Sequence, residues 1–487
     1  MELDASKTSG WNIGKTVTEM RIRVTFPIAG FIINQKKEKK FMRKSKKIAA
    51  AAMAAVMMCS LWGCGNSGGG AGTETTSGGG AAAETTTAKA EEGGSGSKTK
   101  LTMAVWNGNW AEKLEQAQNT FNSQNPDIEL DIQMQTGDYS DFLGAKVASD
   151  DLPDIYILTP YKQVQAFAEA GRLKDLSNEP FVDKVYENAL DASTYNGKVY
   201  GYPANFEYLG VFYNKDLFKQ AGIESVPTTR EEFEACCEKL QAAGINPIAP
   251  TYKDSWTLKH LFSALLTPEV QDDIPGFISK LDSGEGSFDV EGIDEVFAFA
   301  DIMRKYSGGN MMDQDSTSGF NALANGQAAM LLSGEFSQAT VAAMDNPPDI
   351  GCFAIPVSSD AAKNKLGVDV GIVYVVNEKT SDFGACQKVL EFLSNADDPE
   401  GYIAITTARM GDAPPAMPYE GGVACSSSDD YKAYADAGNI VPWVYQQYVN
   451  GFDVISGDIF QGYMAGAKDK DTVIKELNEN YKNFLEQ

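Results

Sequence analysis

The chain has 487 residues, among them 41 Lys and Arg, 67 Asp and Glu and one His, and its formal net charge is −26. A surface this acidic repels phosphate backbones and lacks the clustered basic residues that nucleic-acid binding requires, so we expect no nucleic-acid partner. The single histidine excludes H-E-x-x-H zinc sites and most histidine-rich metal clusters, and we predict neither a metal site nor a cofactor.

The segment before residue 64 has the pattern of an export signal. Basic residues at 43, 44, 46 and 47 precede sixteen uncharged residues, 48–63. A basic region, a short apolar region and a small residue before the cut are typical of a secretory signal peptide. The run is shorter than the roughly 20 residues that a spanning helix needs, which disfavours a transmembrane helix. We therefore predict a signal peptide over 42–63.

Cys64 would then be the first mature residue, which resembles a bacterial lipobox, where the thiol receives a diacylglyceryl group. Two acyl chains are enough for stable anchoring, so we expect the exported chain to be held at the outer face of the cell membrane by this anchor alone. Cleavage as an ordinary signal peptide is the alternative. Residues 1–41 fit no targeting pattern, and we expect translation to begin at Met42.

Residues 64–97 are predicted to comprise the lipidated Cys64 and a disordered linker rich in Gly, Ser and Thr. Residues 65–97 contain eleven Gly with Ser, Thr, Ala and Glu, and no aliphatic residue larger than Ala. Such a segment cannot bury enough apolar surface to offset the entropy of ordering it. We expect a tether of roughly 30 Å. The remaining residues, 98–487, are enough for two domains with sizeable cores.

Strands and helices alternate after residue 98. Residues 101–105 predict a strand, the apolar stripe at 114, 117 and 121 predicts a helix, and alternation over 128–134 predicts a second strand. The continuous apolar run 154–158 is typical of a buried parallel strand. This order predicts α/β layers.

Two further helices are expected in the next part of the chain. One covers 162–170, and the other begins at a capping-box pattern, Thr229 with Glu232. Cys236 and Cys237 lie on the apolar stripe of the second helix, so we expect buried thiols and not a redox pair.

The sequence carries no common catalytic motif. Neither G-x-S-x-G nor G-x-x-x-x-G-K-[ST] occurs, and His260 is the one possible base for a Ser-His-Asp triad. We expect His260 to be a surface or core residue of a helix. Residues 313–319 resemble a calcium loop, but the Gly stands one place late and position twelve is not Glu, which favours a solvated loop. The many acidic residues leave open the alternative that two of them form the carboxylate pair of a glycosidase, and no motif points to such a pair.

The later segments resemble the extracellular solute-binding protein family 1, the maltose-binding-like receptors of ABC importers. The resemblance extends over about residues 98–487. The segments that carry it are YNGKVYGYP (195–203), VFYNKDLF (211–218), Ala221-Gly222, Pro227-Thr228, Glu232-Phe233, Phe320, GQAAM (326–330) and Gly334.

The resemblance implies a periplasmic-binding-protein-like fold of type II, in which two discontinuous α/β lobes are joined by a hinge and the ligand lies in the cleft between them. We expect the first lobe to comprise about 98–205 and 358–400, and the second about 206–355. C-terminal helices over 401–487 should brace both lobes. The two crossings are expected near 203–209 and 354–358.

The ligand-binding candidates follow from the resemblance and from loop positions. Glu207 falls where related receptors place a carboxylate on sugar hydroxyls, Trp256 takes a later aromatic position, and Phe336 stands where sugar binders often carry Trp. Loops at the carboxyl ends of strands form the binding crevice in α/β sheets, and Trp443 belongs either to the site or to the core. The full set is Trp106, Asn107, Trp110, Asp154, Tyr161, Glu207, Trp256, Phe336, Asp369, Arg409 and Trp443.

The implied function is that of a non-catalytic, monomeric receptor. It would capture a sugar or an oligosaccharide and deliver it to the permease subunits of an ABC transporter. Aromatic rings cover the apolar faces of sugars, and carboxylates and amides satisfy their hydroxyls, which agrees with the candidate residues. The alternatives are a cell-surface glycoside hydrolase, a binding protein for a non-sugar solute, and an adhesion or structural lipoprotein.

Overall fold

The computed structural model describes residues 98–486, apart from 107–110, 136–138, 410–412 and 423–425. The predicted signal peptide, Cys64 and linker lie outside the described residues. Within the described ranges, no helix is both long enough and apolar enough to cross a membrane.

The first lobe is built on a five-stranded sheet with the order β2-β1-β3-β11-β6. β1 (Thr99–Trp106) pairs in parallel with β2 (Ile128–Gln135) and β3 (Ile155–Leu158), as the sequence pattern predicts. β11 (Val373–Val376) is antiparallel to β3 and to β6 (Gly201–Pro203). All four residues of β3 are buried, as expected for a strand with both faces covered.

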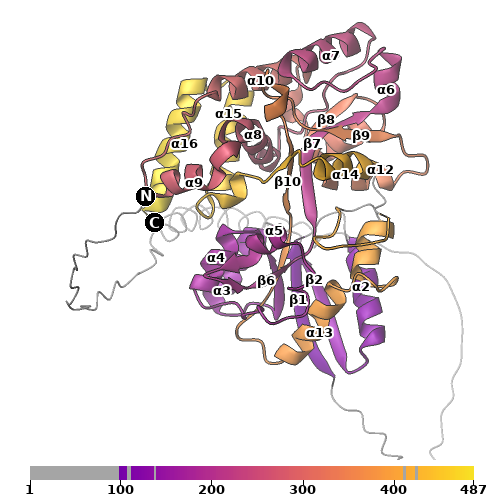
Figure 1. The fold of residues 1–487 in the computed structure, drawn as a ribbon, viewed down its shortest axis with the longest axis vertical. Coiled ribbons are helices and arrows are strands. Elements are labelled where there is room, and N and C mark those ends of the chain that lie inside the picture. The colour runs from indigo at the N-terminus through magenta and orange to yellow at the C-terminus, as the bar shows by residue number, and fades with distance from the viewer. Residues whose placement is uncertain (1–97, 107–110, 136–138, 410–412, 423–425, 487) are drawn as a thin grey trace, which may run out of the picture. The chain divides into compact units, whose positions relative to one another are not determined.

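The helices of this lobe bury their apolar stripes. α2 buries Leu114, Ala117 and Phe121 against the core, which confirms the predicted helix. The helices of the lobe, labelled in Figure 1, are α2 (Ala111–Gln124), α3 (Tyr139–Ser149), α4 (Lys162–Glu169), α5 (Glu187–Leu190) and α13 (Phe383–Leu393). A small hairpin consists of β4 (Thr194–Tyr195) and β5 (Lys198–Val199).

The second lobe has its own sheet, with the order β12-β10-β7-β8 and β9 on β7. Its long central strand, β7 (Phe206–Asn214), pairs antiparallel with β8 (Met330–Gly334), β9 (Ile350–Phe353) and β10 (Leu366–Val370). β12 (Ile440–Val441) is parallel to β10.

The helices of the second lobe surround a core rich in aromatic residues. Thr229 caps α7, because its hydroxyl accepts a hydrogen bond from the Glu232 N–H, and the helix buries Cys236 and Cys237 as predicted. Six helices are α6 (Lys215–Gln220), α7 (Arg230–Ala242), α8 (Ser255–Val270), α9 (Ile274–Asp282), α10 (Ile293–Tyr306) and α11 (Ser316–Ala324). Three later helices are α12 (Gln338–Ala342), α14 (Ser428–Asp436) and α15 (Phe452–Met464), and α16 (Lys470–Leu485) follows.

The two crossings between the sheets lie where β6 meets β7 and where β10 meets β11. The chain leaves the first sheet at Pro203 and enters the second at Phe206; it leaves the second at Val370 and re-enters the first at Val373. The sequence placed the return near 354–358. That position is wrong because β10 completes the second sheet by pairing with β7 before the chain returns.

Backbone hydrogen bonds join these crossings. The Ala204 N–H donates to the Ile372 carbonyl at 2.9 Å, which links the outward and returning crossings. Residues 413–416 lie along the outward crossing, and the Phe206 N–H donates to the Pro414 carbonyl at 2.8 Å. The hinge therefore contains three backbone segments.

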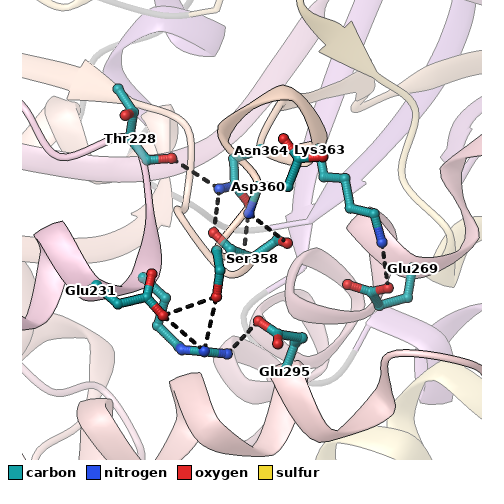
Figure 2. Close-up of polar contacts among 10 residues, drawn as sticks. Thr228, Glu231, Glu269, Glu295, Ser358, Asp360, Lys363 and Asn364 are labelled. Carbon is teal, nitrogen blue, oxygen red and sulfur yellow. Dashed lines mark hydrogen bonds and ion pairs between the residues drawn. The ribbon is translucent and has the colours of Figure 1, made fainter.

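A polar network holds the 358–364 loop to the second lobe, as Figure 2 shows. The amide nitrogen of Asn364 donates to the carbonyl of Thr228, and Arg230 bonds to the Ser359 hydroxyl at 3.0 Å and pairs with Glu295. These contacts explain why the loop stays with the second lobe before β10 begins.

The C-terminal segments contact both lobes. A π-helix, Ala404–Arg409, contacts α2 of the first lobe, whereas α14 packs against β9, and α15 lies along α8 with α16 beside it. The predicted solvated loop over 313–319 is wrong from residue 316 onward, because α11 begins at Ser316, where Asp315 caps the helix by accepting hydrogen bonds from the Ser318 N–H and hydroxyl.

Candidate functional site

The carboxylate that the resemblance singles out lies beside the hinge. Glu207 on β7 is directly opposite Asp369 on β10 in the antiparallel pair, and its side chain is partly buried. Gly371 provides the space for it, because a Cβ atom at Gly371 would lie 2.2 Å from the Glu207 carboxyl carbon. β7, β10 and the hinge thus fix the position of this carboxylate.

Asp369 is a buried acceptor whose two oxygens are already bonded. One oxygen accepts hydrogen bonds from the Tyr161 hydroxyl at 2.7 Å and from the Val370 backbone N–H. The other accepts a hydrogen bond from the Trp443 backbone N–H at 2.9 Å. Burial raises the pKa of Asp369 to about 6, and the three hydrogen bonds oppose that rise. Asp369 therefore connects three segments around the site.

Tyr161 reaches Asp369 from the first lobe. It precedes α4 with φ of 57°, a left-handed conformation that is uncommon for a residue with a bulky side chain. Such strain persists where the surrounding structure holds it, and it is concentrated at functional sites. Burial, and then the charge of Asp369, raise the pKa of the Tyr161 hydroxyl, which stays protonated and donates.

Aromatic side chains of the second lobe form what we call the aromatic wall: Trp256, His260, Phe336, Trp443 and Tyr445. Trp256 and His260 lie four residues apart, on one face of α8, and Trp256 is 40% exposed. The ring of Phe336, just after β8, lies 5.9 Å from that of Trp256. The rings of Trp443 and Tyr445 are stacked at 5.6 Å.

The sequence patterns gave His260, Tyr445 and Gln446 no role in the ligand site. Burial, and then the charge of Glu207, raise the pKa of Tyr445 well above 10. The amide nitrogen of Gln446 donates to the Val370 carbonyl at 3.1 Å, at the returning crossing. Spacing offers one weak signal, because His260 falls one helical turn after Trp256.

Two further candidates, Trp106 and Asp154, belong to the first lobe. Trp106 ends β1, and its ring packs edge-on against Tyr139 at 5.6 Å. Asp154 precedes β3, so it lies at the amino end of that strand, where its carboxylate accepts hydrogen bonds from Thr102 and Thr380. The structure does not bring Asp154 together with the aromatic wall.

Asn107, Trp110 and the side chain of Arg409 lie outside the described residues. In the part of the chain that the structure describes, no group of three or more His, Cys, Asp or Glu side chains is arranged to hold a metal ion. The site combines an exposed indole, further aromatic rings and a carboxylate, which suits a ligand with apolar faces and several hydroxyl groups.

Comparison with known sequences identifies the family. Residues 107–398, more than half of the chain, match the bacterial extracellular solute-binding proteins. The chain belongs to this family. A multiple sugar-binding protein of Streptococcus mutans is 24% identical over 57% of this chain and 66% of its own length, just under two thirds. A maltodextrin-binding protein of Bacillus subtilis is 25% identical over 62% of this chain and 70% of its own length.

Solved structures show the same fold as this solute-binding protein. A chitin oligosaccharide binding protein aligns with a TM-score of 0.70 at 21% identity, covering 80% of this chain and all of the other. A solute-binding protein in complex with raffinose aligns with a TM-score of 0.67 at 19% identity, again over 80% of this chain and all of the other. The predicted type II fold is confirmed.

Proposed function

We propose that the protein is an extracellular receptor that captures a carbohydrate and delivers it to the permease subunits of an ABC transporter. The observation that carries the proposal is the aromatic wall beside Glu207. An exposed indole can cover the apolar face of a sugar ring, and a carboxylate bonds strongly to its hydroxyls. The relatives named for sugars and oligosaccharides support the same ligand class.

A non-catalytic role agrees with the hydrogen bonding of Asp369, the carboxylate opposite Glu207. Glycosidases need one carboxyl group free to donate a proton and a second to act as base or nucleophile. Both oxygens of Asp369 accept hydrogen bonds, although its pKa is raised to about 6. We therefore expect binding without turnover.

A sugar screen tests the proposal. Raffinose, stachyose, maltotriose and chitotriose are added singly to the protein in a thermal-shift assay, and calorimetry measures the affinity of those that raise the melting temperature. Incubated sugars are then analysed by chromatography. No stabilisation by any of these or by other sugars would refute carbohydrate binding, and cleaved sugar would favour the glycoside hydrolase.

We also propose that the exported chain is a monomer anchored through a lipid on Cys64. Mass spectrometry of the N-terminal peptide from the membrane fraction should show a diacylglyceryl group on Cys64, and Cys64→Ser should release the protein. An unmodified peptide beginning elsewhere would refute the anchor. Light scattering of the solute-binding domain, residues 98–487, tests the monomer.

A further inference from the structure

His260 occupies the centre of the aromatic wall. Four rings surround its imidazole: Tyr445 at 5.0 Å, Trp256 at 5.6 Å, Phe336 at 6.0 Å and Trp443 at 6.1 Å between centroids. The side chain is partly exposed and shares a helix face with Trp256. It therefore belongs to the same surface as the exposed indole.

The polar atoms of His260 are not used within the described protein. Neither ring nitrogen makes a hydrogen bond to any residue that the structure describes, and neither is among the fully buried polar atoms of those residues that lack a partner. Both nitrogens therefore keep contact with solvent. The four neighbouring rings contact the imidazole without making a hydrogen bond to it, and an aromatic face is at best a weak acceptor, so a ligand can supply the missing partner.

The imidazole is neutral at physiological pH. Burial, and then the neighbouring charge of Lys259, lower the pKa of His260 well below 6.5. Lys259 is itself held in place by an ion pair with Asp453 at 2.7 Å, and its ammonium lies 5.3 Å above the Tyr445 ring. A neutral imidazole has one donor and one acceptor, which is the complement of a hydroxyl group.

We propose that His260 binds a hydroxyl group of the bound sugar and so helps to set which sugar the protein accepts. The proposal rests on the proposed carbohydrate function and adds a residue to that site. The competing role is structural, in which the ring only fills space among its aromatic neighbours. A phenylalanine would fill that space equally well, because it keeps a ring but has no nitrogen.

The variants His260→Phe and His260→Gln separate these two roles. Calorimetry measures their affinity for the sugar that the unmodified protein binds best, and for analogues of that sugar that each lack one hydroxyl.

We expect His260→Phe to bind this sugar about threefold to tenfold more weakly with an unchanged melting temperature, since one neutral hydrogen bond is lost. His260→Gln keeps a donor and an acceptor and should bind within about threefold of the unmodified protein. The analogue that lacks the hydroxyl group bound by His260 should have the same affinity for the unmodified protein and for His260→Phe.

A second measurement uses the fact that the chain has a single histidine. In protein without a polyhistidine tag, the imidazole nitrogen signals belong to His260 alone, and at pH 7.5 they should shift on sugar addition while the ring stays neutral. Equal affinity of His260→Phe and the unmodified protein, with unmoved ring signals at saturation, would overturn the His260 proposal and leave the receptor intact. If the unmodified protein binds no sugar, the proposed function fails, and the His260 proposal fails with it.

Discussion

At the scale of single residues, the site depends on how two neighbouring carboxylates are accommodated. Asp369 is 4% exposed and keeps its charge through three hydrogen bonds, whereas Glu207 is partly buried in space left by Gly371. Buried charges destabilise a fold unless they are paired or bonded. We therefore expect Asp369 to act mainly on stability and Glu207 mainly on binding.

The stability contributed by Asp369 should depend on pH. Burial raises its pKa in the folded state from 3.8 to about 6, so between these values the folded protein binds more protons than the unfolded protein. The free energy of unfolding of the unmodified protein, relative to Asp369→Asn, should therefore rise as pH falls from 7.5 to 4.5, on the order of 2 kcal/mol. Urea unfolding at several pH values measures this difference. His260, whose pKa is lowered, has the opposite dependence but is present in both proteins. A difference that does not change with pH would contradict the prediction.

Gly371→Ala should weaken sugar binding without unfolding the protein. The added Cβ would lie 2.2 Å from the Glu207 carboxyl carbon, and the end of a flexible side chain can move away. The displaced carboxylate should lose a charged hydrogen bond to the ligand, which contributes about 1.5–3 kcal/mol. Calorimetry and melting check this result. Gly144→Ala is the matched control, because a Cβ atom there meets nothing within 4 Å. Unchanged affinity of Gly371→Ala would remove Glu207 from the site.

At the scale of elements, sequence patterns predicted the strands and helices that depend on residues close together in the chain. The alternation at 128–134 and the capping pair Thr229 and Glu232 depend on neighbouring residues, and β2 and α7 form where they predict. The return crossing could not be located in this way, because the partner of β10 is β7, more than 150 residues earlier in the chain. The position of His260 in the aromatic wall was missed for the same reason, since its four neighbouring rings come from three segments that are far apart in the sequence.

The close contact between α8 and α15 positions the aromatic wall. A Cβ atom at Gly457 of α15 would lie 2.5 Å from the Ser255 carbonyl oxygen and 3.1 Å from the Lys259 backbone nitrogen. Backbone atoms cannot rotate away, so Gly457→Ala should separate the helices, lower the free energy of unfolding by about 1–3 kcal/mol and displace Trp256. Thermal unfolding and Trp fluorescence measure the two effects. Gly144→Ala, with its open surroundings, should change neither. Full stability of Gly457→Ala would show that α8 and α15 are less closely packed.

At the scale of the whole receptor, two adjacent residues of the first lobe make polar contacts with the second. Tyr161 donates to Asp369, and Lys162 pairs with Asp282 at the end of α9 at 2.7 Å. Asp282 is held in turn by the Tyr481 hydroxyl at 2.6 Å. The hinge between the lobes consists of short backbone segments, which suits a rigid-body closing motion. Closure should therefore be coupled to these two contacts.

Lys162→Met should make closure less favourable while leaving each lobe folded. The side chains of Lys162 and Asp282 are 27% and 30% exposed, and their ion pair should contribute about 0.5–1 kcal/mol to the closed state. Small-angle scattering of the unmodified protein should show a smaller radius of gyration when the sugar is added. The variant should need more sugar to reach the same value, and its affinity should fall by about twofold to fivefold. Lys174→Met is the control, because it removes a similar ion pair, with Glu378, inside the first lobe.

If sugar leaves the radius of gyration of the unmodified protein unchanged at saturation, the lobes do not close around the ligand. If Lys162→Met and Lys174→Met bind alike, closure does not depend on the pair between α4 and α9.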